Sequence, residues 1–268
     1  MPSSPLVTRD IQRDIRVIRL SEEHARYTYE MERHFDVYFG AVVPREEDGL
    51  LIADYSEPAV HTYRHNGLQF KIQSLPEEPD AVEGYFKHAP DHGALAFDVG
   101  AYCGLSTYEL SKRFDRVIAF EPDTNNRVCL IDNICRHKLG NVTIVPAAMT
   151  AFVGKTTFYA EGCLGSRMAL PQYVREPLLE VATINLVAAC QMFGVPDFIT
   201  MDIEGAEIEV LAAARDLLTT EKISLAIDTN HEEASGWTVG RVEAILMACD
   251  YEVETEMPGG FYTTFGWK

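Results

Sequence analysis

The sequence is short of basic residues: its 268 residues include 23 Lys and Arg against 41 Asp and Glu, so the formal net charge is −18. Nucleic-acid binding depends heavily on Lys and Arg that neutralise phosphates. The deficit therefore argues against a nucleic acid partner. Hydrophobic residues at 47% and charged residues at 24% are typical of a soluble globular protein, and the excess of acid favours solubility.

Long apolar segments and paired cysteines are also missing. The sequence has no run of about eighteen apolar residues, which a membrane-spanning helix needs. The N-terminal Met1 to Pro5 leads into the charged stretch Arg9 to Arg19 without an apolar core of a signal peptide. The six cysteines form no Cys-x-x-Cys pair, which leaves zinc little support. We expect a cytoplasmic protein with reduced thiols, no membrane partner and no bound metal.

A glycine-spaced turn lies between an apolar strand and a helical pattern. The strand is Ala94 to Val99, and Gly100 and Gly104 interrupt the chain before the helical pattern of Leu105 to Phe114. A glycine here takes a positive φ or lets a ligand approach bare backbone. The first turn of a helix also offers free N–H groups. The stretch therefore predicts a ligand site, although an ordinary strand-to-helix turn would look the same.

Two acids accompany this turn. Asp98 precedes the glycines, where it would repel a pyrophosphate and suit a ligand with a cationic group. Glu121 follows the next apolar run, Val117 to Phe120, at the position where an acid grips both hydroxyls of a ribose. Asp98, which suits a cationic group, and Glu121, which suits a ribose, together predict S-adenosyl-L-methionine as the ligand. A nicotinamide dehydrogenase would need tighter glycine spacing.

Residues 1–90 are expected to form an N-terminal extension with a helix and a β-hairpin. The helix is predicted to begin near Ser21. Its aromatic residues fall on one stripe that suits core packing, an aromatic wall against the substrate or a dimer contact. The hairpin is predicted at Asn66-Gly67, between Val60 to His65 and Leu68 to Gln73. The acidic run Pro76 to Asp80 looks like a connection, so the second domain is expected over residues 91–268.

The second domain alternates strand and helix patterns, which predicts a mostly parallel sheet covered on both faces. Further strands are expected at Val142 to Val145, Asp197 to Asp202 and Ile223 to Ile227. A terminal hairpin of Tyr251 to Thr255 and Phe261 to Trp267 follows the last helix. An extra strand at Lys155 to Tyr159 and an irregular loop from Gly162 to Pro177 are also expected. Ligands of such sheets lie at the carboxyl ends of the strands.

Several motifs between about residues 94 and 255 resemble, in order and spacing, the FkbM family of S-adenosylmethionine-dependent methyltransferases. They are Asp98-Val-Gly-Ala-Tyr-Cys-Gly104, Phe120-Glu-Pro122, Leu130-x-x-Asn133-Ile134, Val145-Pro-Ala-Ala148 and Asp202-Ile-Glu-Gly-Ala-Glu207. The resemblance implies an α/β, Rossmann-like class I methyltransferase fold. Its seven-stranded sheet would be mostly parallel with an antiparallel last strand. It also implies methylation of hydroxyl groups on natural products or sugars.

The chain departs from the family pattern at three places. Tyr102 stands where family members commonly have Asn, and Thr200 stands where they commonly have Lys. The end of the fifth strand, often a glutamate followed closely by histidine, is here Asp228-Thr-Asn-His231. These departures leave the cofactor prediction intact and put the usual substrate chemistry in doubt.

We expect the cofactor at the strand ends. Gly100 and Gly104 would admit its methionine part, Asp98 would orient its ammonium directly or through water, and Glu121 would take the ribose hydroxyls. The small side chains of Ala147 and Ala148 would border the adenine. The full set of candidate cofactor-binding residues is Asp98, Gly100, Ala101, Tyr102, Gly104, Glu121, Pro122, Ala147, Ala148 and Asp202.

For the transfer itself, a hydroxyl acceptor needs positioning and a base within hydrogen-bond reach. The candidate catalytic residues are His231 first, Asp202 second and Glu204 third. His231 could instead be an ordinary surface histidine, and Glu204 could simply complement a helix N-terminus. Asp202 is the hardest of the three to explain without a function, because it ends a strand between hydrophobic neighbours.

Two further interpretations stay open. The residues Asp202, Glu204, Asp228 and His231 could together bind a divalent ion that orients a diol. The chain could also be a non-catalytic interaction protein that keeps the fold, since a fold alone does not prove function. Contacts to the small hydroxylated acceptor are expected from residues 1–90 and from the loop of residues 162–177.

Overall fold

The computed structural model describes residues 6–10, 15–21, 45–47, 50–54, 60–65, 67–73, 82, 84–159, 167–168, 178–233, 236–257 and 262–268. The chain forms two compact units, Met1–Pro76 and Glu77–Lys268. The division lies at the acidic run that we expected to be a connection. Residues 77–90 therefore belong with the second unit, because Tyr85 and Phe86 pack into the core of its sheet.

The first unit contains a small antiparallel sheet and a hairpin. The sheet has the order β1-β2-β4-β3, with β1 (Leu6–Asp10), β2 (Ile15–Ser21), β3 (Arg45–Glu47) and β4 (Leu50–Asp54). Ser21, the expected start of a helix, is the last residue of β2, and the rest of that expected helix lies outside the described residues. The predicted hairpin is confirmed: β5 (Val60–His65) pairs with β6 (Leu68–Gln73), and Gly67 has the positive φ of 79° that its turn requires.

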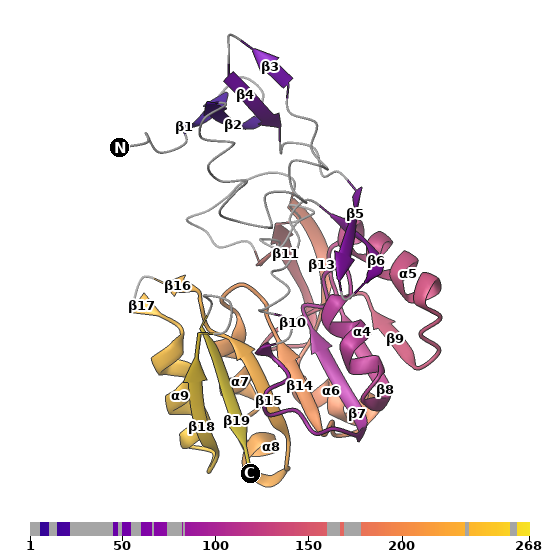
Figure 1. Cartoon of the computed structure of the whole chain (residues 1–268). Coiled ribbons are helices and arrows are strands. Elements are labelled where there is room, and N and C mark those ends of the chain that lie inside the picture. The colour runs from indigo at the N-terminus through magenta and orange to yellow at the C-terminus, as the bar shows by residue number, and fades with distance from the viewer. Residues whose placement is uncertain are drawn as a thin grey trace. The chain divides into compact units, whose positions relative to one another are not determined.

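The second unit is built on a seven-stranded sheet with the order β18-β19-β15-β14-β7-β8-β9 (Figure 1). The strands are β7 (Gly93–Val99), β8 (Phe114–Phe120), β9 (Val142–Val145), β14 (Phe198–Met201), β15 (Ser224–Asp228), β18 (Glu252–Glu256) and β19 (Thr263–Trp267). Strands β9, β8, β7, β14 and β15 pair in parallel, whereas β19 is antiparallel to both of its neighbours. The predicted sheet and the predicted insertion of the terminal hairpin are both confirmed.

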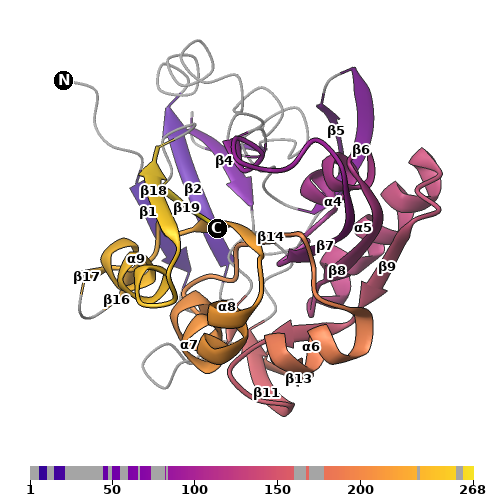
Figure 2. The same cartoon turned by 90° about the horizontal axis from the view of Figure 1, so that it is seen from below.

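Helices cover both faces of this sheet, and Figure 2 shows α4 and α5 on one side and α6, α7 and α8 on the other. The helices are α4 (Leu105–Ser111), α5 (Thr124–His137), α6 (Leu186–Phe193), α7 (Glu207–Ala213), α8 (Arg215–Thr220) and α9 (Val239–Met247). Side chains of a strand alternate between faces, so Ala96 packs with Leu110 of α4 while Phe97 packs with Leu186 of α6. The two faces therefore have separate hydrophobic cores.

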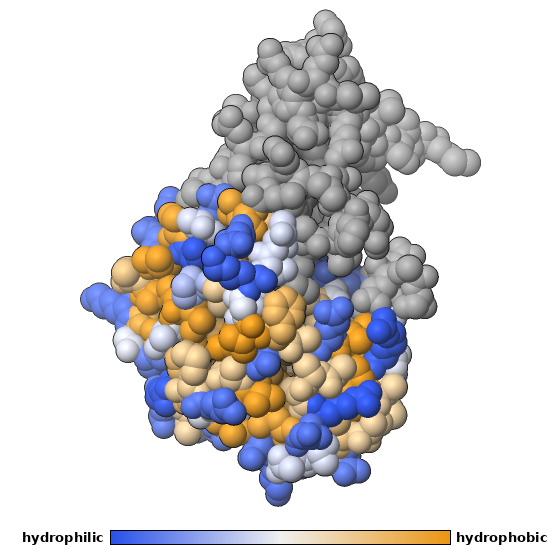
Figure 3. Space-filling model, turned by 180° about the vertical axis from the view of Figure 1, so that it is seen from behind, coloured by the Kyte–Doolittle hydropathy of each residue, from blue (hydrophilic) through white to orange (hydrophobic). Residues whose placement is uncertain are grey.

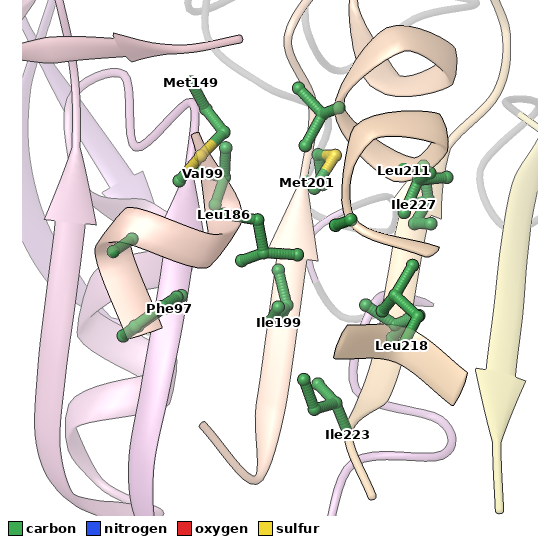
Figure 4. Packing of buried hydrophobic residues seen from close by; sticks show 14 of the residues in the cluster. Phe97, Val99, Met149, Leu186, Ile199, Met201, Leu211, Leu218, Ile223 and Ile227 are labelled. Carbon is green, nitrogen blue, oxygen red and sulfur yellow. The ribbon is translucent and has the colours of Figure 1, made fainter. Parts of the chain in front are cut away.

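The larger core lies between the sheet and α6 to α9. Figure 4 shows Phe97, Val99, Ile199, Met201 and Ile227 of the central strands meeting side chains of the covering helices. Each of these five strand residues has an exposed fraction of 1% or less. Burial of each large side chain contributes roughly 1.5–3 kcal/mol. This packing fixes the strands and with them the residues at their carboxyl ends.

Local sequence sets the ends of several helices. The Asp123 side chain accepts a hydrogen bond from the Asn125 N–H at the start of α5, and Asn185 accepts one from Ala188 at the start of α6. Helix α5 ends at Lys138, which has a positive φ of 57°. On α5, Leu130 is buried, whereas its neighbour Ile131 is 51% exposed.

Three segments outside the main sheet complete the second unit. The residues after β14 form two helices, α7 and α8, because Ala214 between them leaves helical geometry at φ −104° and ψ 12°. The extra strand near Lys155 is confirmed as β11 (Gly154–Tyr159). It joins a side sheet with β10 (Ala147–Met149), β13 (Leu178–Ile184) and β12 (Arg167–Met168). Apart from β12, the expected loop of residues 162–177 lies outside the described residues.

The surface of the second unit mixes residue types. Hydrophilic residues are interspersed among hydrophobic ones on the face drawn in Figure 3. Exposed large hydrophobic side chains include Val128, Phe152, Met192 and Met247, which belong to different elements. Among the described residues, no helix has the length and apolar character needed to span a membrane.

We predict that Gly100→Ala destabilises the protein by at least about 2 kcal/mol in urea denaturation. Gly100 has a positive φ of 87°, and a Cβ atom there would lie 1.8 Å from the backbone oxygen of Asp202. A backbone oxygen of a packed strand end cannot move aside without disturbing the sheet. The substitution therefore combines φ strain with a backbone clash.

The matched control is Gly240→Ala in helix α9, where a Cβ would have no neighbour within 4 Å. Alanine favours a helix over glycine, so this variant should be as stable as the parent or more stable by up to about 1 kcal/mol. Equal stability of the two variants would contradict the packing described for Gly100.

Candidate functional site

The acids predicted at the strand ends come together at one edge of the sheet. Asp98 lies in β7, Glu121 directly follows β8, and Asp202 directly follows β14. Asp228 is the last residue of β15. Because these four strands pair in parallel and in register, their carboxyl ends point to the same side. The structure thus gathers residues that lie far apart in the sequence.

The glycine turn is held by the neighbouring strand. The N–H groups of Gly100 and Ala101 both donate to the Phe120 carbonyl oxygen at 3.0 Å, and the Tyr102 N–H donates to Glu121 Oε2 at 2.9 Å. Tyr102 adopts a positive φ of 48° and Gly104 one of 92°. Tyr102 thus occupies a left-handed position, where Asn would carry less strain than a bulky ring. The turn is rigid and lies against Glu121.

Asp98 is buried, and its carboxylate accepts hydrogen bonds from three hydroxyl groups. Thr200 Oγ1 and Ser106 Oγ donate at 2.9 Å, and Thr107 Oγ1 also donates. Burial raises the pKa of Asp98, while the hydrogen bonds from Thr107, Thr200 and Ser106 oppose that rise. The side chain ties β7 to β14 and to the start of α4. The predicted contact with a cofactor ammonium stays a prediction.

Glu121 is also buried, and it accepts backbone hydrogen bonds from Tyr102 at 2.9 Å and Asp123 at 2.7 Å. Burial raises the pKa of this carboxyl to about 8, although the Asp123 and Tyr102 N–H groups oppose the rise. A carboxylate accepts up to about four hydrogen bonds, so acceptor capacity is left for further donors. Two ribose hydroxyls are donors of that kind.

The remaining predicted cofactor residues line the neighbouring connections. Pro122 is half-buried directly after Glu121. Ala147 and Ala148 are buried in β10, where they pair with Ala182 and Thr183 of β13. Their burial against β13 and the side sheet is one reason for their small size, and a contact with adenine stays a prediction.

His231 lies at the centre of a group of carboxylates at the ends of β14 and β15. Its Nε2 lies 3.5 Å from Asp202 Oδ1, 3.4 Å from Glu207 Oε1 and 3.6 Å from Asp228 Oδ1. Its Nδ1 lies 3.8 Å from Glu204 Oε2. The structure therefore brings together the three predicted catalytic residues, His231, Asp202 and Glu204. We call this group, with Glu207 and Asp228, the His231 cluster.

Electrostatics in the His231 cluster are strongly perturbed. Burial by itself lowers the pKa of His231, but hydrogen bonds and charges from Asp202 and Glu207 outweigh burial and raise it to about 12. Burial, followed by the charge of Asp202, raises the pKa of Asp228 to about 7. Groups shifted this far are typical of functional sites.

Several residues that contribute to the site were given no role by sequence reasoning. Thr200 and Ser106 donate to Asp98, and Asn133 Nδ2 donates to the Cys103 carbonyl oxygen at 2.7 Å, which holds the glycine turn. Tyr85 donates from its hydroxyl to Asp202 Oδ2 and Asp228 Oδ2, both at 3.4 Å. Asn133 lies in a quoted motif, but no local pattern marks Tyr85.

The comparison with family models decides the family. Residues 98–253, more than half of the chain, match the methyltransferase FkbM domain, and this segment contains the glycine turn, Glu121 and the His231 cluster. The chain belongs to the FkbM methyltransferase family. The matched segment is a methyltransferase domain, and it contains every residue that we expect to bind S-adenosyl-L-methionine.

Solved structures of methyltransferases have the same fold. Methyltransferase FkbM from Methylobacillus flagellatus KT is 20% identical with a TM-score of 0.51, over 68% of this chain and 46% of that chain. This FkbM-family chain thus spans about half the length of that relative. The match to precorrin-6y C5,15-methyltransferase from Geobacter metallireducens GS-15 has 14% identity and a TM-score of 0.48, over 72% of this chain and 90% of that chain. We find no curated protein that matches the sequence.

The residues at the strand ends fit S-adenosylmethionine in their chemistry. Glu121 supplies acceptor oxygens for a ribose, and the positive-φ glycines give the close turn that precedes α4. The anionic His231 cluster lies beside this turn, because the Asp202 backbone lies against Gly100. Negative charge there favours a ligand that carries a sulfonium and an ammonium. The roles of individual residues remain predictions.

We predict that Glu121→Gln changes how stability depends on pH. The pKa of Glu121 is about 8 in the folded protein, above the ordinary value of 4.5. The folded state therefore binds more protons than the unfolded state between these values, and stability falls as the pH rises through that window. Glutamine does not titrate, so the variant should lose this contribution, which amounts to up to about 1.4 kcal/mol per pH unit.

Urea denaturation of both proteins at pH 5 and pH 7.5 measures the effect. Asp98 and Asp228 are present in both proteins, so the difference between the two pH dependences isolates the contribution of Glu121. We expect the variant to gain stability relative to the parent as the pH rises. Parallel pH dependences would show that Glu121 is not a buried acid.

Proposed function

We propose that this FkbM-family methyltransferase transfers a methyl group to a hydroxyl oxygen of a small molecule, such as a natural product or a sugar. The observation that carries the proposal is the His231 cluster, where carboxylates and an imidazole lie beside the glycine turn. A hydroxyl is a poor nucleophile until a neighbouring group accepts its proton. The cluster offers such acceptors at the place where the acceptor molecule would meet the cofactor.

The two partly exposed carboxylates of the cluster are best placed to meet an acceptor. The side chains of Asp202 and Glu204 are 26% and 23% exposed, whereas Glu207 is fully buried. When bound, S-adenosylmethionine supplies a methyl group on a positively charged sulfur. The acceptor oxygen forms the new C–O bond as the C–S bond breaks, the bonding pair stays on sulfur, and the hydroxyl proton passes to a carboxylate of the cluster. We assign that proton to Glu204 and a positioning role to His231.

We also propose that the protein acts in the cytoplasm. All five cysteines within the described residues are free thiols, which fits a reducing compartment. The net charge of −18 supports an acceptor other than nucleic acid. We also propose that the N-terminal extension of residues 1–90 forms a homodimer contact, which gel filtration tests.

The first test is to incubate the protein with S-adenosylmethionine and a panel of sugars, polyols, hydroxy acids and phenols, with matched amines as the contrast. We expect S-adenosylhomocysteine to form with hydroxylated molecules and mass spectrometry to find the added methyl group on oxygen. Methylation of the amines alone would contradict the proposal, since an anionic cluster also attracts protonated amines.

We predict that Glu204→Gln lowers kcat by about 10² to 10⁴, the contribution expected of a group that accepts the proton. The affinity for S-adenosylmethionine should stay within about twofold. The matched control is Glu209→Gln in α7, because Glu209 is exposed to solvent and loses the same charge. Equal kcat values for the two variants would show that Glu204 does not accept the proton.

A further inference from the structure

Three donor atoms of the His231 cluster lie close enough together to bind one cation. One ligand atom from each of Asp202, Asp228 and His231 lies within 4.8 Å of the others. Two neighbouring ligands about 2.1 Å from one ion lie about 3.0 Å apart in an octahedron. His231 Nε2 lies 3.5 Å and 3.6 Å from the two Asp Oδ1 atoms, so the side chains would close in by about 0.5 Å around an ion.

Unpartnered buried atoms provide a second, independent observation. Glu207 is completely buried, its Oε1 lies 3.4 Å from His231 Nε2, and its Oε2 has no hydrogen-bond partner among the described residues. Asp202 Oδ1 and His231 Nε2 are likewise buried and make no hydrogen bond, and they face each other at 3.5 Å. Native proteins leave few buried polar atoms without a hydrogen bond. Asp202 and His231 are two of the three candidate ligands, and a cation bound between them would contact both atoms.

The charge of the cluster is poorly balanced by the protein. Within the part of the chain that the structure describes, no Lys or Arg forms an ion pair with Asp202, Glu207 or Asp228. Three close carboxylates repel one another, and one imidazole offsets at most one charge. A divalent cation would balance them.

Tyr85 orients two of the ligands. Its hydroxyl donates to the Oδ2 atoms of both Asp202 and Asp228 at 3.4 Å, while the Oδ1 atoms of both residues face His231. Hydrogen bonds to the outer atoms of metal ligands hold them in place. Tyr85 is therefore a positioning residue for Asp202 and Asp228.

We propose that Asp202, Asp228 and His231 bind a divalent cation of the Mg²⁺ or Mn²⁺ class. The carboxylates suit both ions, and the imidazole favours Mn²⁺. Resting on the proposed function, the inference also defines the acceptor: a molecule with a hydroxyl and a second oxygen on the neighbouring carbon, which together chelate the ion. An α-hydroxy acid or a vicinal diol has this arrangement.

The cation would assist methyl transfer without changing which bonds form and which break. A hydroxyl bound to the ion loses its proton more readily. That proton passes to Glu204, whose Oε2 lies near the other ring nitrogen, Nδ1. The acceptor oxygen takes the methyl carbon, and the C–S bonding pair remains on sulfur. Because a metal and a proton compete for Nε2, binding of the ion displaces any proton held there.

The test measures Mn²⁺ binding to the full chain by electron paramagnetic resonance, after chelator treatment and without S-adenosylmethionine. We expect one tight Mn²⁺ per chain, displaced by excess Mg²⁺. Asp228→Asn and His231→Gln should each weaken binding by at least about tenfold. Asp216→Asn should leave binding unchanged, because Asp216 is an exposed acid of α8 and carries the same charge.

Calorimetric binding of S-adenosylmethionine to each variant shows that it is folded and tests the cofactor site separately. No Mn²⁺ binding, or equal binding by the parent, Asp228→Asn and His231→Gln, would overturn the cation site. If S-adenosylmethionine still binds in that case, the proposed methyl transfer stands without a metal. Loss of activity on chelation and its recovery with Mn²⁺ would extend the inference to the reaction.

Discussion

The burial of carboxylates at the carboxyl ends of adjacent parallel strands is the constraint on which the rest of the structure depends. Asp98, Glu121 and Asp228 are each at most 6% exposed, and Glu207 is completely buried. An ionised carboxylate out of water is costly unless hydrogen bonds or opposite charges compensate it. Hydroxyls surround Asp98, backbone N–H groups bind Glu121, and His231 faces Asp228. The groups that surround each carboxylate come from a different strand or connection.

The sheet makes this arrangement possible because its strands are held on both faces. The core beneath β7, β14 and β15 fixes their register, and the register aligns the acids. Gly100 then lets the backbone after β14 come against the turn after β7. The close approach brings the glycine turn next to the His231 cluster. The residues that we propose for cofactor binding and for acceptor chemistry thus share one edge of one sheet.

The sequence alone predicts the features that are encoded locally. The glycine spacing after Asp98, the acid after β8 and the alternation of strands and helices identify the family fold and the strand-end residues. Strand β13 was missed, because Leu178–Ile184 follows a segment without clear periodicity. The small sheet of β1 to β4 was also not predicted.

Contacts between distant residues could not be predicted in the same way. Thr200 lies 102 positions from Asp98, and Tyr85 lies 143 positions from Asp228. Neither pair has a spacing that a helix or a hairpin would impose. Glu207 ends a motif quoted from the sequence, and only the fold shows that it is buried with its Oε1 3.4 Å from His231 Nε2. Contacts within one turn can be predicted from the sequence, whereas contacts between residues that the sheet brings together cannot.

The most direct test of the account is calorimetric titration of the purified protein with S-adenosylmethionine and S-adenosylhomocysteine, repeated with Glu121→Ala. The account predicts that both ligands bind one to one, and that the variant binds each at least about tenfold more weakly. That loss corresponds to a missing charge-assisted hydrogen bond of at least about 1.4 kcal/mol. A folded protein that gives no binding heat with either ligand, or a variant that binds as tightly as the parent, would contradict it.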